Sequence, residues 1–175
     1  HLPSRPAHLP RPRLWKVRAK QVIIAQGAHE RPFVFTGNDL PGVMLAGAVR
    51  TYINRYGVCP GRRAIVVCNN DDAYRTALDL CHAGADVVIT DLRNDAKGPL
   101  ITAARNAGIE ILQGHAIIAA YGNRRVAWVE IATVNDCVTA ISGDILHRVC
   151  DLIAMSGGLS PSVHLDSQAR GILQC

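Results

Sequence analysis

The turn between Cys68 and Ala73 holds the residues that are best placed to bind a ligand. It follows the short run 62–68, which is mostly apolar, and precedes a segment with helical spacing. In dinucleotide-binding folds, a strand followed by a helix N-terminus holds a pyrophosphate on backbone N–H groups. The motif for that role requires glycine at positions 68 and 70 and glycine or alanine at position 73. Only Ala73 meets it.

The side chains of this turn oppose nucleotide binding, although its position is right. Asn69 and Asn70 adopt a positive φ more readily than most residues, so they can form the turn, but they crowd a pyrophosphate. Asp71 and Asp72 add negative charge at a helix N-terminus, where carboxylates stabilise the helix itself. We expect helix capping to be their role and expect NAD to bind weakly or not at all at this turn.

Asp91 is the second candidate, because it ends the next predicted strand. It lies about 20 residues beyond the turn, where an acidic side chain binds the ribose hydroxyls of NAD. Arg93 could attract a ribose phosphate or could pair with Asp91. Aspartates at strand ends are also common turn formers, so the spacing leaves these alternatives open.

Two further elements run from an apolar strand to a glycine. VIIAQGA leads to Gly27 and Ala28, and DLIAMSGGLSP leads to Gly157 and Gly158. Glycine at a strand end lets a ligand or another backbone segment approach closely. The candidate cofactor-binding residues are therefore Gly27, Ala28, Asn69, Asn70, Asp71, Asp91, Gly157 and Gly158.

Other chemistries find no support in the sequence. It contains no HExxH or GxSxG motif and no CxxC pair, so it indicates neither hydrolysis nor a metal site, and we assign no catalytic residue. We expect the six cysteines to be free thiols. They stand at positions 59, 68, 81, 137, 150 and 175.

The elements that position these residues alternate between strands and helices. Strands are predicted from residue 13 towards 20 and at 22–25, 62–68, 85–91, 109–112, 115–122, 125–134 and 148–155. Helices are predicted at about 43–56, 70–83 and 100–106, and a loop at 32–42. The strand–helix–strand unit over 62–91 favours a parallel sheet, and a hairpin at Gly122–Asn123 adds a β-meander.

Composition limits the classes of protein that the chain can represent. With 175 residues and 49% hydrophobic residues, it is long and apolar enough for one compact domain. The net charge of +5 comes mainly from the proline- and arginine-rich first twenty residues, of which 1–12 are predicted to be extended. Charge is balanced elsewhere, which argues against a nucleic-acid partner. Without a membrane-length apolar run, a cytoplasmic protein is expected.

Long strings of the sequence resemble a known family. RLWKVRAKQVIIAQGAHERPFVFTGNDLPGVMLAGAVRTYINRYGV, CNNDDAYRTALDL and CDLIAMSGGLSPSVHL resemble the alpha subunit of the heterotetrameric sarcosine oxidases. The resemblance implies an internal fragment of a flavoprotein whose FAD-type outer domain is interrupted by an NAD-type, Rossmann-like insert. It divides the chain into outer-domain residues 1–36, the insert 37–154 and a return segment 155–175, which all give an α/β fold.

The same resemblance implies an activity and partners. The family oxidatively demethylates sarcosine to glycine with oxygen, using FAD and FMN in the complex, NAD on the alpha subunit, and folate bound by a downstream domain. The beta, gamma and delta subunits are the implied partners, and the fragment alone is expected to be inactive and to bind no flavin stably. The family carries NND in place of the loop glycines, which fits Asn69, Asn70 and Asp71.

The expected role of this segment within such a protein is dinucleotide binding and assembly with the other subunits. Two alternatives remain open at this point. One is a subunit of a related amine or opine dehydrogenase-type flavoprotein, and the other is a non-catalytic interaction module.

Overall fold

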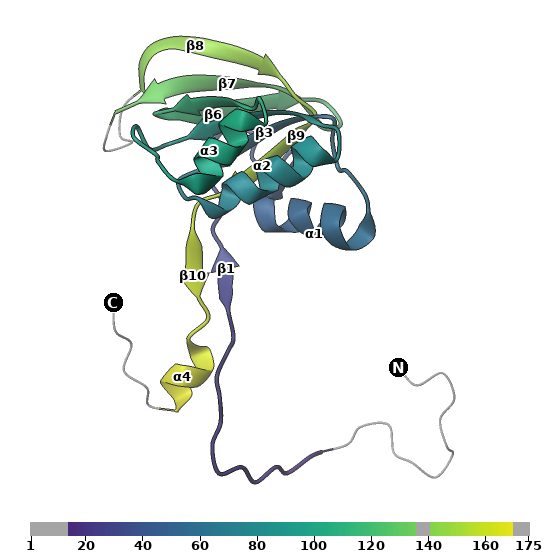
Figure 1. Cartoon of the computed structure of the whole chain (residues 1–175), viewed down its shortest axis with the longest axis vertical. Coiled ribbons are helices and arrows are strands. Elements are labelled where there is room, and N and C mark those ends of the chain that lie inside the picture. The colour runs from purple at the N-terminus through teal and green to yellow at the C-terminus, as the bar shows by residue number, and fades with distance from the viewer. Residues whose placement is uncertain (1–13, 136–140, 170–175) are drawn as a thin grey trace. The chain divides into compact units, whose positions relative to one another are not determined.

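The computed structural model describes residues 14–135 and 141–169, so the predicted extended start, 1–12, lies outside the described residues. The chain divides into two compact units, and the one spanning 27–162 holds all of the described strands (Figure 1). The predicted domain boundaries at 36/37 and 154/155 both lie within this unit. Among the described residues, no helix is long and apolar enough to cross a membrane.

A five-stranded parallel sheet forms the centre of this unit. Its strands lie in the order β2 (Val43–Leu45), β9 (Leu152–Ser156), β3 (Arg63–Cys68), β4 (Asp86–Asp91) and β5 (Glu110–Gln113). The run Ala64–Cys68 is buried on both faces, as expected for the central strand of a covered parallel sheet. All five strands therefore present their carboxyl ends at one edge, where such folds bind ligands.

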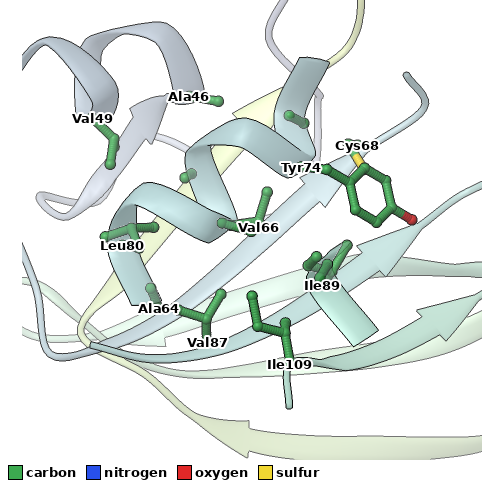
Figure 2. Close-up of a cluster of buried hydrophobic side chains, with 14 of the residues drawn as sticks. Ala46, Val49, Ala64, Val66, Cys68, Tyr74, Leu80, Val87, Ile89 and Ile109 are labelled. Atoms are coloured by element: carbon green, nitrogen blue, oxygen red, sulfur yellow. The ribbon is translucent and has the colours of Figure 1, made fainter. Parts of the chain in front are cut away.

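Helices cover one face of the sheet. They are α1 (Ala46–Tyr56), α2 (Asp72–His82) and α3 (Pro99–Asn106). Figure 2 shows the apolar cluster beneath them, in which Leu80 and Tyr74 of α2 lie against side chains of β3 and β4. Gly57 ends α1 with a φ of 65°, a left-handed conformation that favours glycine.

An antiparallel meander covers the other face. It consists of β6 (His115–Gly122), β7 (Val126–Val134) and β8 (Ile141–Val149). Ile65 and Val67, which alternate with the helix-facing residues of β3, belong to the same buried apolar cluster as Val129 and Ile131 of β7. The predicted fold class, a Rossmann-like parallel sheet with a β-meander, is confirmed.

A short two-stranded ladder lies where the chain enters and leaves this unit. β1 (Ala28–Glu30) pairs antiparallel with β10 (Leu159–Pro161), with His29 opposite Ser160. In the other compact unit, the helix α4 (His164–Gln168) follows.

Four predicted elements differ from the structure, two of which are the strands predicted between residues 13 and 25. Residues 14–27 form no strand, because no described strand lies beside them to accept their backbone hydrogen bonds. The helix predicted from residue 43 begins at Ala46, because residues 43–45 pair with β9 instead. The strand predicted over 148–155 is two strands separated at residues 150–151, where Asp151 Oδ1 accepts the backbone N–H groups of Arg62 and Arg63, each at 2.9 Å.

Candidate functional site

Three strand ends meet at the carboxyl edge of the central sheet. In the register of the sheet, Cys68 of β3 lies opposite Asp91 of β4 on one side and opposite Ser156 of β9 on the other. The turn 69–71 leaves this edge and leads into α2. We refer to this arrangement, made of the turn 69–71 and the ends of β3, β4 and β9, as the carboxyl-edge crevice.

Asp91 is fully buried and all of its acceptor positions are used. Its Oδ1 accepts the backbone N–H and the Nε–H of Arg93, each at 3.0 Å. Its Oδ2 accepts the Tyr74 hydroxyl and Arg93 Nη2, each at 2.8 Å. A carboxylate offers about four acceptor sites. The geometry therefore leaves Asp91 no oxygen lone pair to offer a ribose hydroxyl.

Arg93 also binds the turn. Its Nη1 donates to Asp71 Oδ1 at 2.8 Å, so one guanidinium joins the turn before α2 to the end of β4. Hydrogen bonding to Asp91, and then to Asp71, raises the pKa of Arg93 further above its usual value. The sequence left open whether Arg93 binds a ribose phosphate or pairs with Asp91, and the structure shows that it pairs with Asp91.

Asn70 fixes the turn from the inside. Its Oδ1 accepts the backbone N–H of Ala73 at 3.3 Å, while its Nδ2 donates to the carbonyl and hydroxyl oxygens of Ser156 at 3.0 and 3.1 Å. Asn69 Nδ2 lies 3.5 Å from the Gly157 carbonyl oxygen. The amide side chain of Asn70 thus spans the crevice from β3 to β9.

The predicted capping role of the aspartates needs a correction. Asp71 is the N-cap residue of α2, but it makes no side-chain cap hydrogen bond, because its carboxylate is turned to Arg93. Asn70 supplies the capping oxygen instead. Asp72, in the first turn of α2, pairs with Arg50 at 3.4 Å and with Arg75 at 3.3 Å.

Backbone packing accounts for the second glycine pair. A Cβ atom at Gly157 would lie 2.9 Å from the carbonyl oxygen of Arg31, and Gly158 has a φ of 94° that side-chain-bearing residues rarely adopt. The Arg31 backbone exchanges hydrogen bonds with both glycines, each at 2.8 Å. Here glycine permits the close approach of another backbone segment.

The first glycine element belongs to the β1–β10 ladder. The Gly27 carbonyl oxygen accepts the Ser162 N–H at 2.9 Å, and Ala28 lies opposite Pro161. Gly27 has a φ of 71°, and a Cβ atom placed there would meet nothing within 4 Å. The structure thus brings Asn69, Asn70, Asp71, Asp91 and Gly157 together, while Gly27 and Ala28 are part of the ladder.

Protonation states in the crevice disfavour nucleophilic or redox thiol chemistry. Burial, reinforced by the charge of Asp91, raises the pKa of the Cys68 thiol well above its usual value. Burial and the hydrogen bond to Asp91 likewise raise the pKa of Tyr74, which stays a donor. Tyr74, Ser156 and Arg31 were not predicted as site residues, because all three act through tertiary contacts that sequence spacing does not show.

The sequence is related along most of its length to one group of proteins. It is 38% identical over 169 residues to the sarcosine oxidase alpha subunit of Corynebacterium sp. (strain P-1), which covers 95% of this chain and 17% of that protein. Identity to the corresponding protein of Rhizobium meliloti (strain 1021) is 38% over 172 residues, covering 98% of this chain and 16% of the relative. The chain thus spans about one sixth of these relatives. No family model matches the chain.

A more distant relative shares part of this sequence, and two solved structures share its fold. An opine oxidase subunit of Agrobacterium tumefaciens (strain Ach5) is 34% identical over 76 residues, which is 43% of this chain and 15% of that protein. The fold is similar to thioredoxin reductase of T. acidophilum, with a TM-score of 0.63 and 12% identity over 78% of this chain and 43% of that chain. For the Lactococcus lactis enzyme the TM-score is 0.61, with 20% identity over 81% and 46% of the two chains.

Proposed function

We propose, starting from the relationship of this chain to an internal segment of sarcosine oxidase alpha subunits, that it is part of an oxidoreductase subunit that takes part in the oxidation of sarcosine. In this proposal the longer protein assembles with beta, gamma and delta subunits, and the complex uses FAD, FMN and NAD. The demethylation of sarcosine to glycine takes place outside this segment, with oxygen as acceptor and folate as recipient of the one-carbon unit.

Within that protein we assign residues 37–154 to an inserted NAD-type domain that serves assembly and holds no nucleotide at the turn 69–71. One observation carries this assignment: Asp91 is fully buried, with Arg93 donating to both of its oxygens and Tyr74 donating to Oδ2. A ribose would have to displace one of these partners. Removing one partner of a buried ion pair costs about 3–5 kcal/mol, because the other charge stays buried and unpaired.

The pyrophosphate position supports the same assignment. Close approach of phosphate requires a turn without side chains and with free donors. Here the Asn70 amide already donates to Ser156, and the carboxylate of Asp71 lies beside the turn. The residues present do not fit a dinucleotide, so NAD in the whole subunit is assigned to the outer domain, with Gly27 and Gly158 at its rim.

The test is NAD binding by the intact alpha subunit. Calorimetric titration of the wild type and the Asp91→Ala variant should give nearly equal affinities for NAD. The matched control is Asp86→Ala, which removes an exposed residue at the start of the same strand. A tenfold or larger loss confined to the Asp91 variant, about 1.4 kcal/mol, would place the nucleotide in the insert.

Oxygen consumption by the assembled complex tests the substrate. We expect turnover with sarcosine and none with an opine. The partial match to a subunit of opine oxidase supports the alternative of an opine-oxidising protein. Preference for an opine over sarcosine would therefore replace this proposal with that alternative.

A further inference from the structure

The carboxyl-edge crevice contains its own cation, and we infer that Arg93 acts as a built-in ligand that completes the fold in place of a bound nucleotide. This inference rests on the proposed function, which leaves the crevice without a dinucleotide. It assigns to the crevice a preference for a planar cation of the guanidinium class. Anionic ligands, including nucleotides, are excluded by the same acceptor set.

The contacts of Arg93 resemble those of a bound ligand more than those of a surface ion pair. Nε and Nη2 hold the two oxygens of Asp91 at 3.0 and 2.8 Å, and Nη1 holds Asp71 at 2.8 Å. The planar fork of a guanidinium matches a carboxylate in this bidentate way, which an ammonium does not. All three nitrogens of the group are therefore directed into the crevice.

The backbone places Arg93 for this role. The N–H of Leu92 donates to the Cys68 carbonyl oxygen at 2.9 Å, and the Arg93 carbonyl oxygen accepts the Gly114 N–H at 3.1 Å. The residue is thus tied to β3 on one side and to the loop after β5 on the other. Its side chain remains 34% exposed, so a small cation could reach the same position if the side chain were removed.

Charge explains why the crevice needs this cation. Asp91 has no exposed surface, and Asp71 lies at the turn that faces it across the guanidinium. Without Arg93, two carboxylates would face each other, and the buried one would keep only the Tyr74 hydroxyl and a backbone N–H. A nucleotide would add further negative charge and would not replace the lost partner.

Thermal unfolding of the 175-residue chain, followed by circular dichroism, tests the inference. Arg93→Ala should lower the melting temperature by about 6–20 °C, the range that corresponds to unpairing a buried charge in a chain of this size. Arg93→Lys should recover only part of this loss. The matched control is Arg75→Ala, which breaks the exposed pair with Asp72 and should lower it by at most about 2–4 °C.

Chemical rescue separates a ligand from an ordinary core contact. N-ethylguanidinium at low millimolar concentration should raise the melting temperature of Arg93→Ala with saturation, and should leave the wild type and Arg75→Ala unchanged. Ethylammonium at the same concentration should rescue poorly. If Arg93→Ala does not fold, the same titration is made on Arg93→Ser, which also removes the guanidinium. Asp71→Asn measures the contribution of the more exposed carboxylate.

The outcomes distinguish this inference from the proposed function. Equal melting temperatures of Arg93→Ala and Arg75→Ala would overturn the inference that Arg93 is a built-in ligand. Equal rescue by N-ethylguanidinium and ethylammonium would overturn it as well. NAD should shift the melting temperature of neither wild type nor Arg93→Ala. A NAD-dependent rise in the wild type that disappears in Asp91→Asn would instead contradict the proposed function.

Discussion

Arg31 and Gly157 exchange close backbone contacts although they lie far apart in the sequence: the Gly157 N–H donates to the Arg31 carbonyl oxygen at 2.8 Å, and a Cβ atom at Gly157 would lie 2.9 Å from that oxygen. Because the neighbour is backbone rather than a flexible side chain, it cannot move aside cheaply. The contact connects the start of the unit 27–162 to the end of β9.

Gly157→Ala is therefore expected to destabilise the chain by about 1–3 kcal/mol, the usual cost of overpacking. Urea denaturation would measure this as a lower midpoint. The control is Gly57→Asn, at the end of α1, where φ is 65° and no atom lies within 4 Å of an added Cβ. Asparagine tolerates this conformation, so the control should lose less than about 1 kcal/mol. Equal losses would refute the steric argument.

The Asn70 side chain offers a second stability prediction. Asn70→Ala removes the capping oxygen and both donations to Ser156, and it should cost about 1–3 kcal/mol in urea denaturation. Asn70→Asp keeps the capping oxygen but places a carboxylate against the Ser156 carbonyl, so it should not restore stability. Asn69→Ala, at an exposed position, is the control. A stable Asn70→Ala variant would contradict the proposed link between β3 and β9.

Thiol accessibility should separate Cys59 from Cys68 and Cys150. Cys59 is exposed, whereas Cys68 and Cys150 are buried. Burial raises the pKa of Cys150 to about 12 and raises that of Cys68 well above its usual value. Iodoacetamide at mildly alkaline pH should therefore label Cys59 in the folded chain and spare Cys68 and Cys150, as read by peptide mass spectrometry. Labelling of Cys68 at the rate of Cys59 would show that the crevice opens.

The same groups predict a loss of stability in alkali. Because their folded pKa values are raised, Cys68, Cys150 and Tyr74 keep their protons in the folded chain after the unfolded chain has released them. The folded state binds more protons above about pH 8.5, so stability is complete below that pH and falls as the pH rises further. For each group, the free energy of unfolding falls by up to about 1.4 kcal/mol per pH unit.

Urea midpoints measured from neutral to strongly alkaline pH would reveal this fall. Cys150→Ala should flatten the curve, since it removes one of the groups with a raised pKa. Cys59→Ala serves as the control because Cys59 is exposed. A stability that does not change across this range would contradict the raised pKa values.

Periodicity predicts much of this fold because burial imposes it. The run 62–68 and the amphipathic segment that became α2 follow directly from which faces are covered, and both were predicted to within about two residues of their observed ends. Elements that depend on distant partners were not predictable in this way. The strand at Val43–Leu45 exists because β9 lies beside it, and residues 14–27, which were predicted as strands, have no described strand beside them.

The candidate site follows the same division. Its position, at the turn 69–71 and at Asp91, could be predicted because strand ends and helix starts are visible in the sequence. The hydrogen-bond donors that occupy the Asp91 carboxylate could not be predicted, because Tyr74 reaches it from α2 and Arg93 reaches it from the residues after β4. Spacing locates a carboxylate, but only tertiary structure shows which donors it already has.

The β1–β10 ladder also bears on how such a domain is gained or lost. Gly27 and Ser162 are joined by one backbone hydrogen bond of 2.9 Å, so the unit between them enters and leaves through neighbouring points. A gene deletion that splices residue 26 to residue 163 would need to bridge only this short gap. Excision of the whole unit would then require only a single deletion between two neighbouring points of the chain.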